Sequence, residues 1–463
     1  MKTNQFANLS LVLTCASMVV EVSARSPIPP AAWKISLFDL GFSRGPSGLV
    51  FGSSVLDMED ISVNPDGTFV ATDVSGRWFF SDDFIYLVMG DVQPAAITRE
   101  LDTMILAGSS GGGSGFVNVE FNAAIALPTE DFTRADVAGT WQLLRQTSIS
   151  FSDSQFGSQG YNGVFHSHET LALNENGTFT LTEVSNTDPG DEDLGSPISG
   201  TWSVLGGRTV RLAAGGETLD IASLSAGLDT FTDFQTETFS QGSNTNFDRK
   251  VVFGVKTPTA LASAELVGRW GLTGMTIEVE DDLSPTYLQE LRGATFEVGD
   301  VSLLADGKGV YRRLRTNDPS LSAIENFEWL VVGSKVLVTG DDGLSFYFHV
   351  SAGKDFAVAL DIENGPGDDT DSYDVLTLCR LPDAPGFAAV RSNFDFSGTP
   401  QLCIATADGL FYQLQRSKNM RDWVNVGDPV EGDGTEKCIE DADAPDAGGS
   451  AFYRWTIVAG PGD

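Results

Sequence analysis

Two histidines in the segment FHSHE, residues 165–169, are the clearest candidates for chemistry in this sequence. His166 and His168 are separated by one residue, and residues at that spacing project from the same face of a β-strand. Two imidazoles on one face are a usual part of a metal site, but such a site needs a further ligand. The remaining histidine, His349, lies in another repeat unit. The pair is therefore read as metal ligands, as the lining of a ligand pocket, or as structural residues that hydrogen-bond locally.

A match to a nucleophile motif occurs at 108–112, where Gly-Ser-Ser-Gly-Gly fits the pattern G-x-S-x-G. That motif works as a strained turn between a strand and a helix, with a histidine and an acid to follow. Here it lies within GSSGGGSG, which has the composition of a flexible linker. No spacing among the 64 acidic residues singles out a carboxylate pair for glycoside hydrolysis. We assign no catalytic residue.

Three acidic segments offer carboxylates of the kind that bind Ca²⁺. They are DPGDEDLG (188–195), NGPGDDTDSYD (364–374) and DADAPDAGG (441–449). None keeps the register of an EF-hand loop, so solvated hairpin ends are the simpler interpretation. The best calcium candidates are Asp441, Asp443 and Asp446, and no other cofactor is expected.

Aromatic residues in FSDSQFGSQGYNG (151–163) could stack on a ligand. Phe151, Phe156 and Tyr161 lie between the first and second strands expected in their repeat unit. The alternative is that these rings close the open end of their own domain.

The composition indicates a folded, acidic, multidomain protein. The chain has 463 residues, 41% of them hydrophobic, which is enough for several packed cores. Its net charge of −36 disfavours nucleic acid and anionic lipid as partners. Acidity of this kind favours solubility in a salty exterior, with capture of a cationic or metal ligand as the alternative reading.

The N-terminus has the pattern of an export signal. Lys2 precedes the apolar run 9–20, and Val22-Ser23-Ala24 is a small-residue cleavage site. Cys15 is poorly placed for lipidation. After residue 24 no apolar run reaches the ~18 residues of a membrane span. We expect a secreted, periplasmic or cell-surface protein.

Three cysteines remain after the signal: Cys379, Cys403 and Cys438. The last two share the C-terminal segment, so a disulfide between Cys403 and Cys438 is favoured, which leaves Cys379 as a buried thiol. An oxidising exterior suits such a bond.

A threefold internal repeat organises most of the sequence. The segments ISVNPDGTFVATDV (61–74), LALNENGTFTLTEV (171–184) and VSLLADGKGVYRRL (301–314) share one pattern. Each unit has a first tryptophan upstream of this pattern and a second one downstream of it: Trp33 and Trp78, Trp141 and Trp202, Trp270 and Trp329. Short joints with one helical turn should connect neighbouring units. A β-propeller is the main architectural alternative.

The pattern inside each unit predicts antiparallel strands and hairpins. Apolar residues alternate with a period of two, and the turns contain Asn-Gly or Asp-Gly, which suits type I′ turns. The apolar parity changes near Glu59-Asp60 and Gly299-Asp300, which predicts a bulge or sharp bend there. Helix is expected mainly at 284–293, SPTYLQELRG.

The units resemble the lipocalin-like, or calycin, barrels over residues 30–383. The resemblance rests on AGTW (138–141), VGRW (267–270) and the closing Arg380. The first unit departs from it, with Ala32 before Trp33 and no closing arginine after Leu127. The resemblance implies an up-and-down barrel plugged at one end by the Gly-x-Trp strand, with ligand entry at the opposite mouth. The connections 142–165 and 271–295 would be the gates.

The last 80 or so residues have a different character. The segments YQLQRSKNMRDWVNVGDPV (412–430) and DADAPDAGGSAFYRW (441–455) resemble a small C-terminal β-sandwich of secreted bacterial proteins. The domain organisation predicted is a signal at 1–24, lipocalin-like repeats at 25–128, 129–258 and 259–383, and the β-sandwich at 384–463.

The sequence as a whole predicts an all-β protein of three tandem antiparallel lipocalin-like barrels followed by a β-sandwich. The favoured function is an exported, non-enzymatic binding or interaction protein, with a small molecule or an extracellular polymer as its partner. One alternative is a structural spacer whose barrels are filled by their own side chains. The other is a hydrolase of an extracellular polymer.

Overall fold

The computed structural model of this chain describes most of residues 31–381 and parts of the C-terminal region. The described residues are 31–45, 48–64, 68–70, 75–81, 84–88, 92–112, 116–153, 158–187, 196–206, 209–241, 244–281, 289–341, 343–364, 370–381, 391–393, 401–405, 411–417, 423–431, 436–441 and 452–458. The export signal lies outside them.

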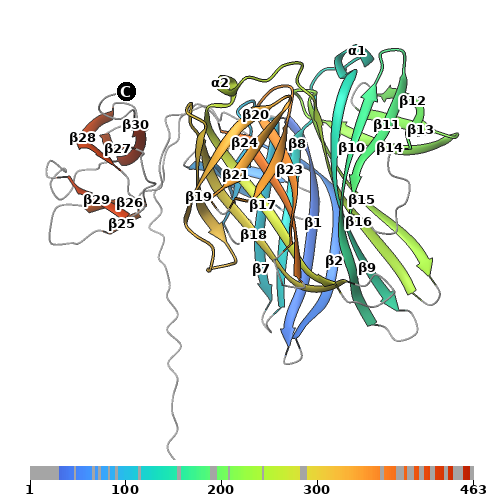
Figure 1. Ribbon diagram of the computed structural model, residues 1–463, viewed down its shortest axis with the longest axis horizontal. Coiled ribbons are helices and arrows are strands. Elements are labelled where there is room, and N and C mark those ends of the chain that lie inside the picture. The colour runs from blue at the N-terminus through green and yellow to red at the C-terminus, as the bar shows by residue number, and fades with distance from the viewer. Residues whose placement is uncertain are drawn as a thin grey trace, which may run out of the picture.

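The repeat region forms three closed antiparallel barrels of eight strands each, packed side by side (Figure 1). Within each barrel every strand pairs with the next, and the last pairs with the first. The propeller alternative is therefore wrong. The strands of the first barrel are β1 Ala31–Gly45, β2 Gly48–Val63, β3 Thr68–Val70, β4 Ser75–Ser81, β5 Phe84–Val88, β6 Val92–Ile97, β7 Thr103–Gly112 and β8 Phe116–Ala126.

The other two barrels repeat this order with similar strand lengths. The second contains β9 Gly139–Asp153, β10 Ser158–Leu173, β11 Thr178–Asn186, β12 Ile198–Leu205, β13 Thr209–Ala214, β14 Glu217–Leu224, β15 Thr230–Gln241 and β16 Asn244–Lys256. The third contains β17 Gly268–Asp281, β18 Gln289–Leu303, β19 Lys308–Thr316, β20 Ile324–Val332, β21 Lys335–Gly340, β22 Ser345–Val350, β23 Phe356–Asn364 and β24 Thr370–Arg380.

The first tryptophan of each unit closes one end of its barrel. Trp33, Trp141 and Trp270 are each 1% exposed and belong to the interior core of their own barrel. One-turn helices, α1 Arg134–Val137 and α2 Ser263–Leu266, precede the second and third barrels, as predicted for the joints. The indole of Trp141 donates to the carbonyl of Val137, and that of Trp270 to the carbonyl of Leu266. The helix therefore serves as the acceptor that a buried indole requires.

The closing basic residue differs between the units. The Arg380 guanidinium lies over the Trp270 ring, 5.9 Å from its centroid, and donates to the carbonyl of Val267. Lys256 pairs in register with Trp141 and donates to the carbonyl of Asp136. In the first barrel Ala126 stands opposite Trp33, so the expected departure of that unit is confirmed.

Apolar side chains form two kinds of core. One kind fills the closed end of each barrel, and the other lies between the barrels. The core between the barrels unites Phe38 and Phe121 of the first barrel, Phe253 of the second, and Phe296 and Phe356 of the third. A strand near the centre of the molecule therefore has apolar residues on its inner face near the closed end of its barrel. Further along, where it meets the other barrels, its apolar residues lie on the outer face.

This double burial explains the change of apolar parity along β18, the second strand of the third unit. Phe296 and Val298 face the core between the barrels, while Val301 and Leu303 face the interior of the third barrel. A register shift does occur at Val298/Gly299, in the pairing with β19. The pairing of β2 with β1 runs through Glu59 and Asp60 without a shift. The side chains of Leu56 and Met58 lie outside the described residues.

The hairpin turns differ in detail from the type I′ prediction. Gly177 has φ 83° and Gly307 has φ 84°, but Asn176 is not among the described residues with positive φ. The amide of Gly177 donates to the carbonyl of Asn174, and the amide of Trp202 donates to the carbonyl of Gly177. These turns are therefore four-residue turns with a left-handed glycine last, and the glycine carbonyl fixes the start of the next hairpin. Gly67 lies outside the described residues.

Two further expectations are corrected by the strand pattern. The connections 142–165 and 271–295 are mainly long strands, because β9 pairs with β10 and β17 pairs with β18 far beyond the barrel floor. The segment 284–293 is not a helix where it is described. Gln289–Gly293 belongs to β18 and pairs with Glu278–Asp281 of β17.

The C-terminal region has two three-stranded sheets. One contains β25 Arg391–Asn393, β26 Gln401–Ala405 and β29 Glu436–Glu440, and the other contains β28 Trp423–Glu431, β27 Phe411–Ser417 and β30 Phe452–Val458. Leu402, Tyr412, Leu414 and Val426 from both sheets share one small core. Leu304, Val310 and Ile324 of the third barrel pack against that core, so this module adjoins the third barrel.

Candidate functional site

The interior of the third barrel is hollow. It holds a cavity of about 660 Å³, within the size range of small-molecule sites. The closed end of the second barrel leaves only about 20 Å³. The reason lies in β15 and β23, the strands that follow the turns at 225–229 in the second barrel and 351–355 in the third. Phe231 of the second barrel packs on Trp141, with ring centroids 5.7 Å apart, whereas the equivalent residue of the third barrel is Ala357.

The first barrel also has a large side chain at this position. Met104 occupies the position of Phe231 and Ala357, two residues after the aspartate of the same turn, and it belongs to the interior core. Two residues further along, Leu106 stands where the third barrel has Ala359. Two alanines in place of large side chains therefore leave the third lumen open.

The cavity is apolar at its closed end and acidic higher up. Its floor is made of Trp270, Leu272, Val301, Leu303, Phe348, Leu376 and Leu378. Among the described residues, seven carboxylates and a single guanidinium line the remainder, together with hydroxyl and amide groups. These charged residues are Glu278, Glu297, Asp318, Glu325, Asp341, Asp361, Asp374 and Arg313.

Two of the carboxylates stand directly opposite each other on neighbouring strands. Asp361 of β23 pairs in register with Asp374 of β24, and Asp374 pairs with Thr276 of β17 on its other side. Like charges in such positions destabilise a sheet. Burial raises the pKa of Asp361, with a backbone hydrogen bond from Ile362 acting in the opposite direction. This wall therefore concentrates negative charge in a partly dehydrated place.

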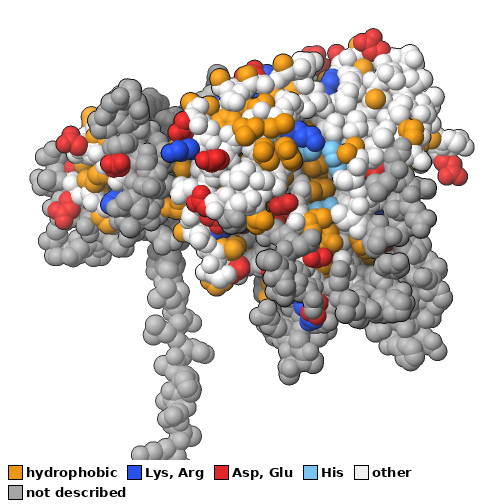
Figure 2. Space-filling model, viewed as in Figure 1, with side chains coloured by type: hydrophobic (Ala, Val, Ile, Leu, Met, Phe, Trp, Pro, Cys, Tyr) orange, Lys and Arg blue, Asp and Glu red, His pale blue; other side chains and the backbone are white. Residues whose placement is uncertain are grey.

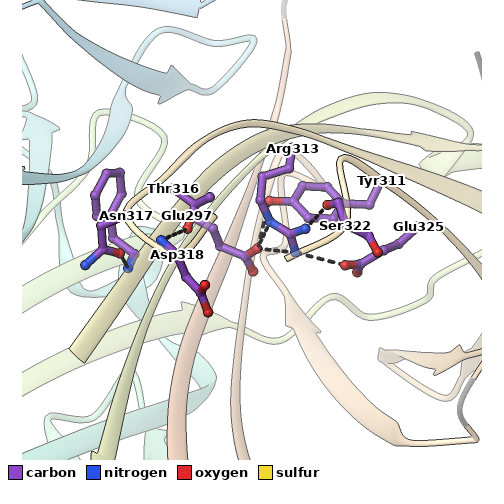
Figure 3. A network of polar contacts seen from close by, with 9 residues as sticks. Glu297, Tyr311, Arg313, Thr316, Asn317, Asp318, Ser322 and Glu325 are labelled. Carbon is purple, nitrogen blue, oxygen red and sulfur yellow. Dashed lines mark hydrogen bonds and ion pairs between the residues drawn. The ribbon is translucent and has the colours of Figure 1, made fainter. Parts of the chain in front are cut away.

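A polar network fixes Glu297 one step closer to the floor (Figure 3). The Tyr311 hydroxyl donates to Glu297 over 2.9 Å, and Arg313 Nε donates to the same carboxylate oxygen over 2.9 Å. Arg313 also contacts Glu325 over 3.0 Å and donates to the carbonyl of Ser322. Burial raises the pKa of Glu297, while the charge of Arg313 counteracts it. The Arg313 guanidinium is thus engaged by protein groups.

The connection between β19 and β20 is tied to the wall beside this network. The Asn317 side chain accepts from the amide of Phe296 and donates to the carbonyl of Ala294. Asp318 receives its own hydrogen bonds from Ser320. Asp318, Leu321 and Ser322 border the cavity, so this segment shapes one side of the mouth.

The second barrel has a different cavity in its open half, of about 450 Å³. Its charges are nearly balanced, because Arg145 and Lys250 accompany Glu169, Glu183 and Asp248. Arg145 forms an ion pair with Glu169 over 3.0 Å. Lys250 pairs in register with Thr147, as Asp374 does with Thr276, so a cation and an anion occupy equivalent wall positions.

The three histidines come together at the junction of the second and third barrels, where Figure 2 shows histidine at the surface. His166 borders the cavity of the second barrel, yet its ring packs edge-on against Tyr373 of the third, with centroids 5.1 Å apart. The rings of His168 and His349 are 4.5 Å apart. Their Nε2 partners are Gln146 for His166 and Gln142 for His168.

Burial keeps these imidazoles neutral. It lowers the pKa of His166 to about 3, and it lowers the pKa of His168 to about 4 with help from Lys335. The pKa of His349 falls to about 2, through burial and the nearby His168 and Lys335. Among the residues that the structure describes, no three His, Cys, Asp or Glu side chains are grouped to hold a metal ion. The meeting of His349 with His168 was not foreseen from the sequence.

The remaining predicted site residues lie at the margins of the described structure. Phe151 and Tyr161 belong to β9 and β10, but their side chains, and all of Phe156, lie outside the described residues. Asp441 is 2% exposed and accepts two hydrogen bonds from Arg416, over 2.8 and 2.7 Å. Asp443 and Asp446 lie outside the described residues, so calcium binding there stays a prediction.

Cys438 is disulfide-bonded and stands opposite Cys403 in register, while Cys379 is a buried free thiol. Within the described part of the chain, no helix combines the length and the apolar character needed to cross a membrane.

Sequence reasoning missed the residues that define the cavity. Asp361 lies in DFAVALDIE, which alternates as a strand, and Asp374 ends NGPGDDTDSYD, which was considered as a calcium-binding segment or a solvated hairpin end. An alignment of the last strands of the second and third units would have shown that Lys250 and Asp374 occupy equivalent positions. Ala357 carries no chemical signal of its own, and only the equivalent Phe231 makes it informative.

Comparisons with known proteins give weak similarity. No family model matches the sequence, and no curated protein matches it. Two mutants of Transferrin Binding Protein B from Haemophilus parasuis Hp5 are similar at 8% identity over 76% of either chain, with TM-scores of 0.23 and 0.22. Intact Ap-TbpB, with its N and C lobes, is similar at 6% identity over 77% of this chain and 79% of that one, with a TM-score of 0.21. Such scores carry no argument about function. On its own strand topology, the chain is an all-β protein with closed, eight-stranded, up-and-down barrels.

Proposed function

We propose that this protein is an exported, non-enzymatic binding protein that takes up a small molecule in the lumen of its third barrel. The observation that carries the proposal is the cavity of about 660 Å³, with an apolar floor and polar groups above it. Sites of this size and lining are typical of small-molecule binding. The proposed location is the cell surface, the periplasm or the medium, because the chain begins with an export-signal pattern.

The alternative of a structural spacer has one observation in its favour. The closed end of the second barrel is almost filled by its own side chains. We propose that the first two barrels support the third, through the core that all three share.

Filling the third lumen tests the proposal. Ala357→Phe places in the third barrel the side chain that the second barrel has at Phe231. Wild-type protein incubated with a library of small apolar and amphipathic compounds should show ligands that raise its melting temperature. For a compound at 100 times its Kd the increase corresponds to about 2.7 kcal/mol. The variant should lose that increase, because the phenyl ring takes the ligand's place at the floor.

Leu330→Phe is the matched control, since Leu330 is 51% exposed on the outside of β20 in the same barrel. It should respond to ligands as the wild type does. A ligand that stabilises Ala357→Phe as strongly as the wild type would place binding elsewhere and contradict the proposal.

A further inference from the structure

We propose that the ligand of the third barrel is an amphipathic organic cation, an amine or quaternary ammonium that carries an apolar body. This inference rests on the proposed function, because it concerns the same lumen.

The charge of the lumen is strongly one-sided. Of the lining residues that the structure describes, seven carry a carboxylate and one, Arg313, carries a guanidinium. Arg313 is already held by Glu297, Glu325 and the carbonyl of Ser322. In a low-dielectric cleft lined by one sign of charge, the field is focused and attracts ions of the opposite sign. A carboxylate or phosphate ligand would meet repulsion on entry, whereas an ammonium group would be attracted.

The acidic wall has a defined height. Asp361 and Asp374 face each other across β23 and β24, above Leu376 and Leu378 on the same inward face of β24. Four residues separate Asp374 from Leu378, which is about 13 Å along a strand. A ligand that places its apolar body on the floor would therefore bring a cationic head to the level of the two aspartates. The cation would also relieve the like-charge pairing of Asp361 with Asp374.

The second barrel supplies an internal contrast. At the position of Asp374 it has Lys250, and at the position of Asp361 it has Gln235. Where the third barrel has Gly274 on its inner wall, the second has Arg145. The same scaffold thus carries balanced charge in one barrel and acidic charge in the other. The fold does not require the acidic wall, so the ligand is the better explanation for it.

Three probes of equal chain length separate charge from hydrophobicity. Dodecylamine, dodecan-1-ol and dodecanoic acid are titrated calorimetrically into the mature chain at neutral pH and low salt, below the concentration at which each aggregates. The amine is expected to bind at least about tenfold more tightly than the alcohol, a difference of about 1.4 kcal/mol. Dodecanoate should bind most weakly.

The double variant Asp361→Asn/Asp374→Asn tests the origin of this preference. The advantage of the amine over the alcohol should fall to roughly threefold or less, about 0.7 kcal/mol, while the affinity for the alcohol stays within a factor of two or so. Glu183→Gln/Asp248→Asn removes the same charge from the second barrel and should leave the preference intact.

The outcomes distinguish the two proposals. If the alcohol or the acid binds the wild type as tightly as the amine, the cation proposal is overturned and the lumen remains a binding site. The cation proposal is also overturned if the aspartate variant keeps the full preference for the amine. If none of the three probes binds, the proposed function itself fails.

Discussion

Differences at single equivalent positions give each barrel its properties. Ala357 in place of Phe231 opens the third lumen, and Asp374 in place of Lys250 reverses the charge of its wall. The sequence singled out His166 and His168 as candidates for chemistry. It could not predict that His168 would meet His349, because that contact depends on how two barrels pack and on no local pattern.

The buried histidines should make the protein less stable in mild acid. The pKa of His168 is lowered to about 4 and that of His349 to about 2, mainly by burial. An unfolded histidine titrates near pH 6.5. Below that value the unfolded chain takes up protons that the folded chain refuses. The stability gained from neutral imidazoles is therefore complete above about pH 6.5 and is lost as the pH falls toward 4.

The variant His349→Gln tests this account by thermal melting at pH 7, 6 and 5. It keeps a polar group beside His168 and Lys335 but removes one proton-binding site from the unfolded chain. The fall in melting temperature from pH 7 to pH 5 should be smaller than in the wild type. His168→Gln/His349→Gln should reduce the slope further. A slope that is unchanged in both variants would show that these histidines titrate alike in the folded and unfolded chain.

Glycines in several strands leave room for an aromatic ring of the neighbouring strand to pack over them. Phe231 stands opposite Gly254, Phe179 opposite Gly200, and Phe327 opposite Gly309. A Cβ on Gly254 would lie 2.0 Å from the Phe231 ring, and one on Gly309 would lie 2.0 Å from the Phe327 ring. In each pair the aromatic side chain covers the glycine of the neighbouring strand.

The strands were predictable because apolar and polar residues alternate along them in every unit. What the sequence concealed was the second buried face. Val298 and Val301 look like a broken alternation, yet they serve two different cores. The segment 289–293 shows the opposite failure, since its capping residues favour a helix but pairing with β17 makes it a strand.

Gly254→Ala should destabilise the second barrel by about 1–3 kcal/mol, the usual cost of overpacking a close contact. The added methyl group forces the Phe231 ring off Trp141. Chemical denaturation of the full chain measures the change. Phe231→Leu should remove most of the penalty when combined with Gly254→Ala, because the smaller side chain leaves room for the methyl group. Additive effects of the two changes would refute this steric origin.

At the scale of the whole molecule, three equivalent turns join the barrels around a central point. Leu101, Leu228 and Lys354 have φ of 60°, 58° and 61°, and each precedes an aspartate. Asp102 accepts a hydrogen bond from the amide of Gly227, and Asp229 accepts one from the amide of Gly353. The repeated motifs SAGLD (225–229) and SAGKD (351–355) are visible in the sequence. Their meeting is not, because nothing in one repeat specifies how it docks on another.

The cluster of aspartates at these three turns should make the stability of the fold depend on pH in the opposite sense to the histidines. Burial raises the pKa of Asp355 to about 7, with Asp229, Asp102 and Glu100 adding negative charge around it and Ser351 donating a hydrogen bond. The nearby Cys379 thiol is neutral, since burial raises its pKa. An unfolded aspartate titrates near pH 4. The folded chain keeps its proton longer, so the stabilising contribution is complete below about pH 4 and is lost as the pH rises to about 7.

Asp355→Asn should therefore stabilise the protein more at pH 8 than at pH 5. Asparagine keeps an oxygen that can accept from Ser351 but cannot ionise among the other two aspartates. The melting temperature of the variant minus that of the wild type should rise between pH 5 and pH 8. Asp131→Asn makes the same charge change at an exposed position and should give a difference that hardly varies with pH. If the melting-temperature difference for Asp355→Asn is equally independent of pH, the aspartates at the three turns contribute nothing that depends on pH. The shared apolar core alone then holds the barrels together.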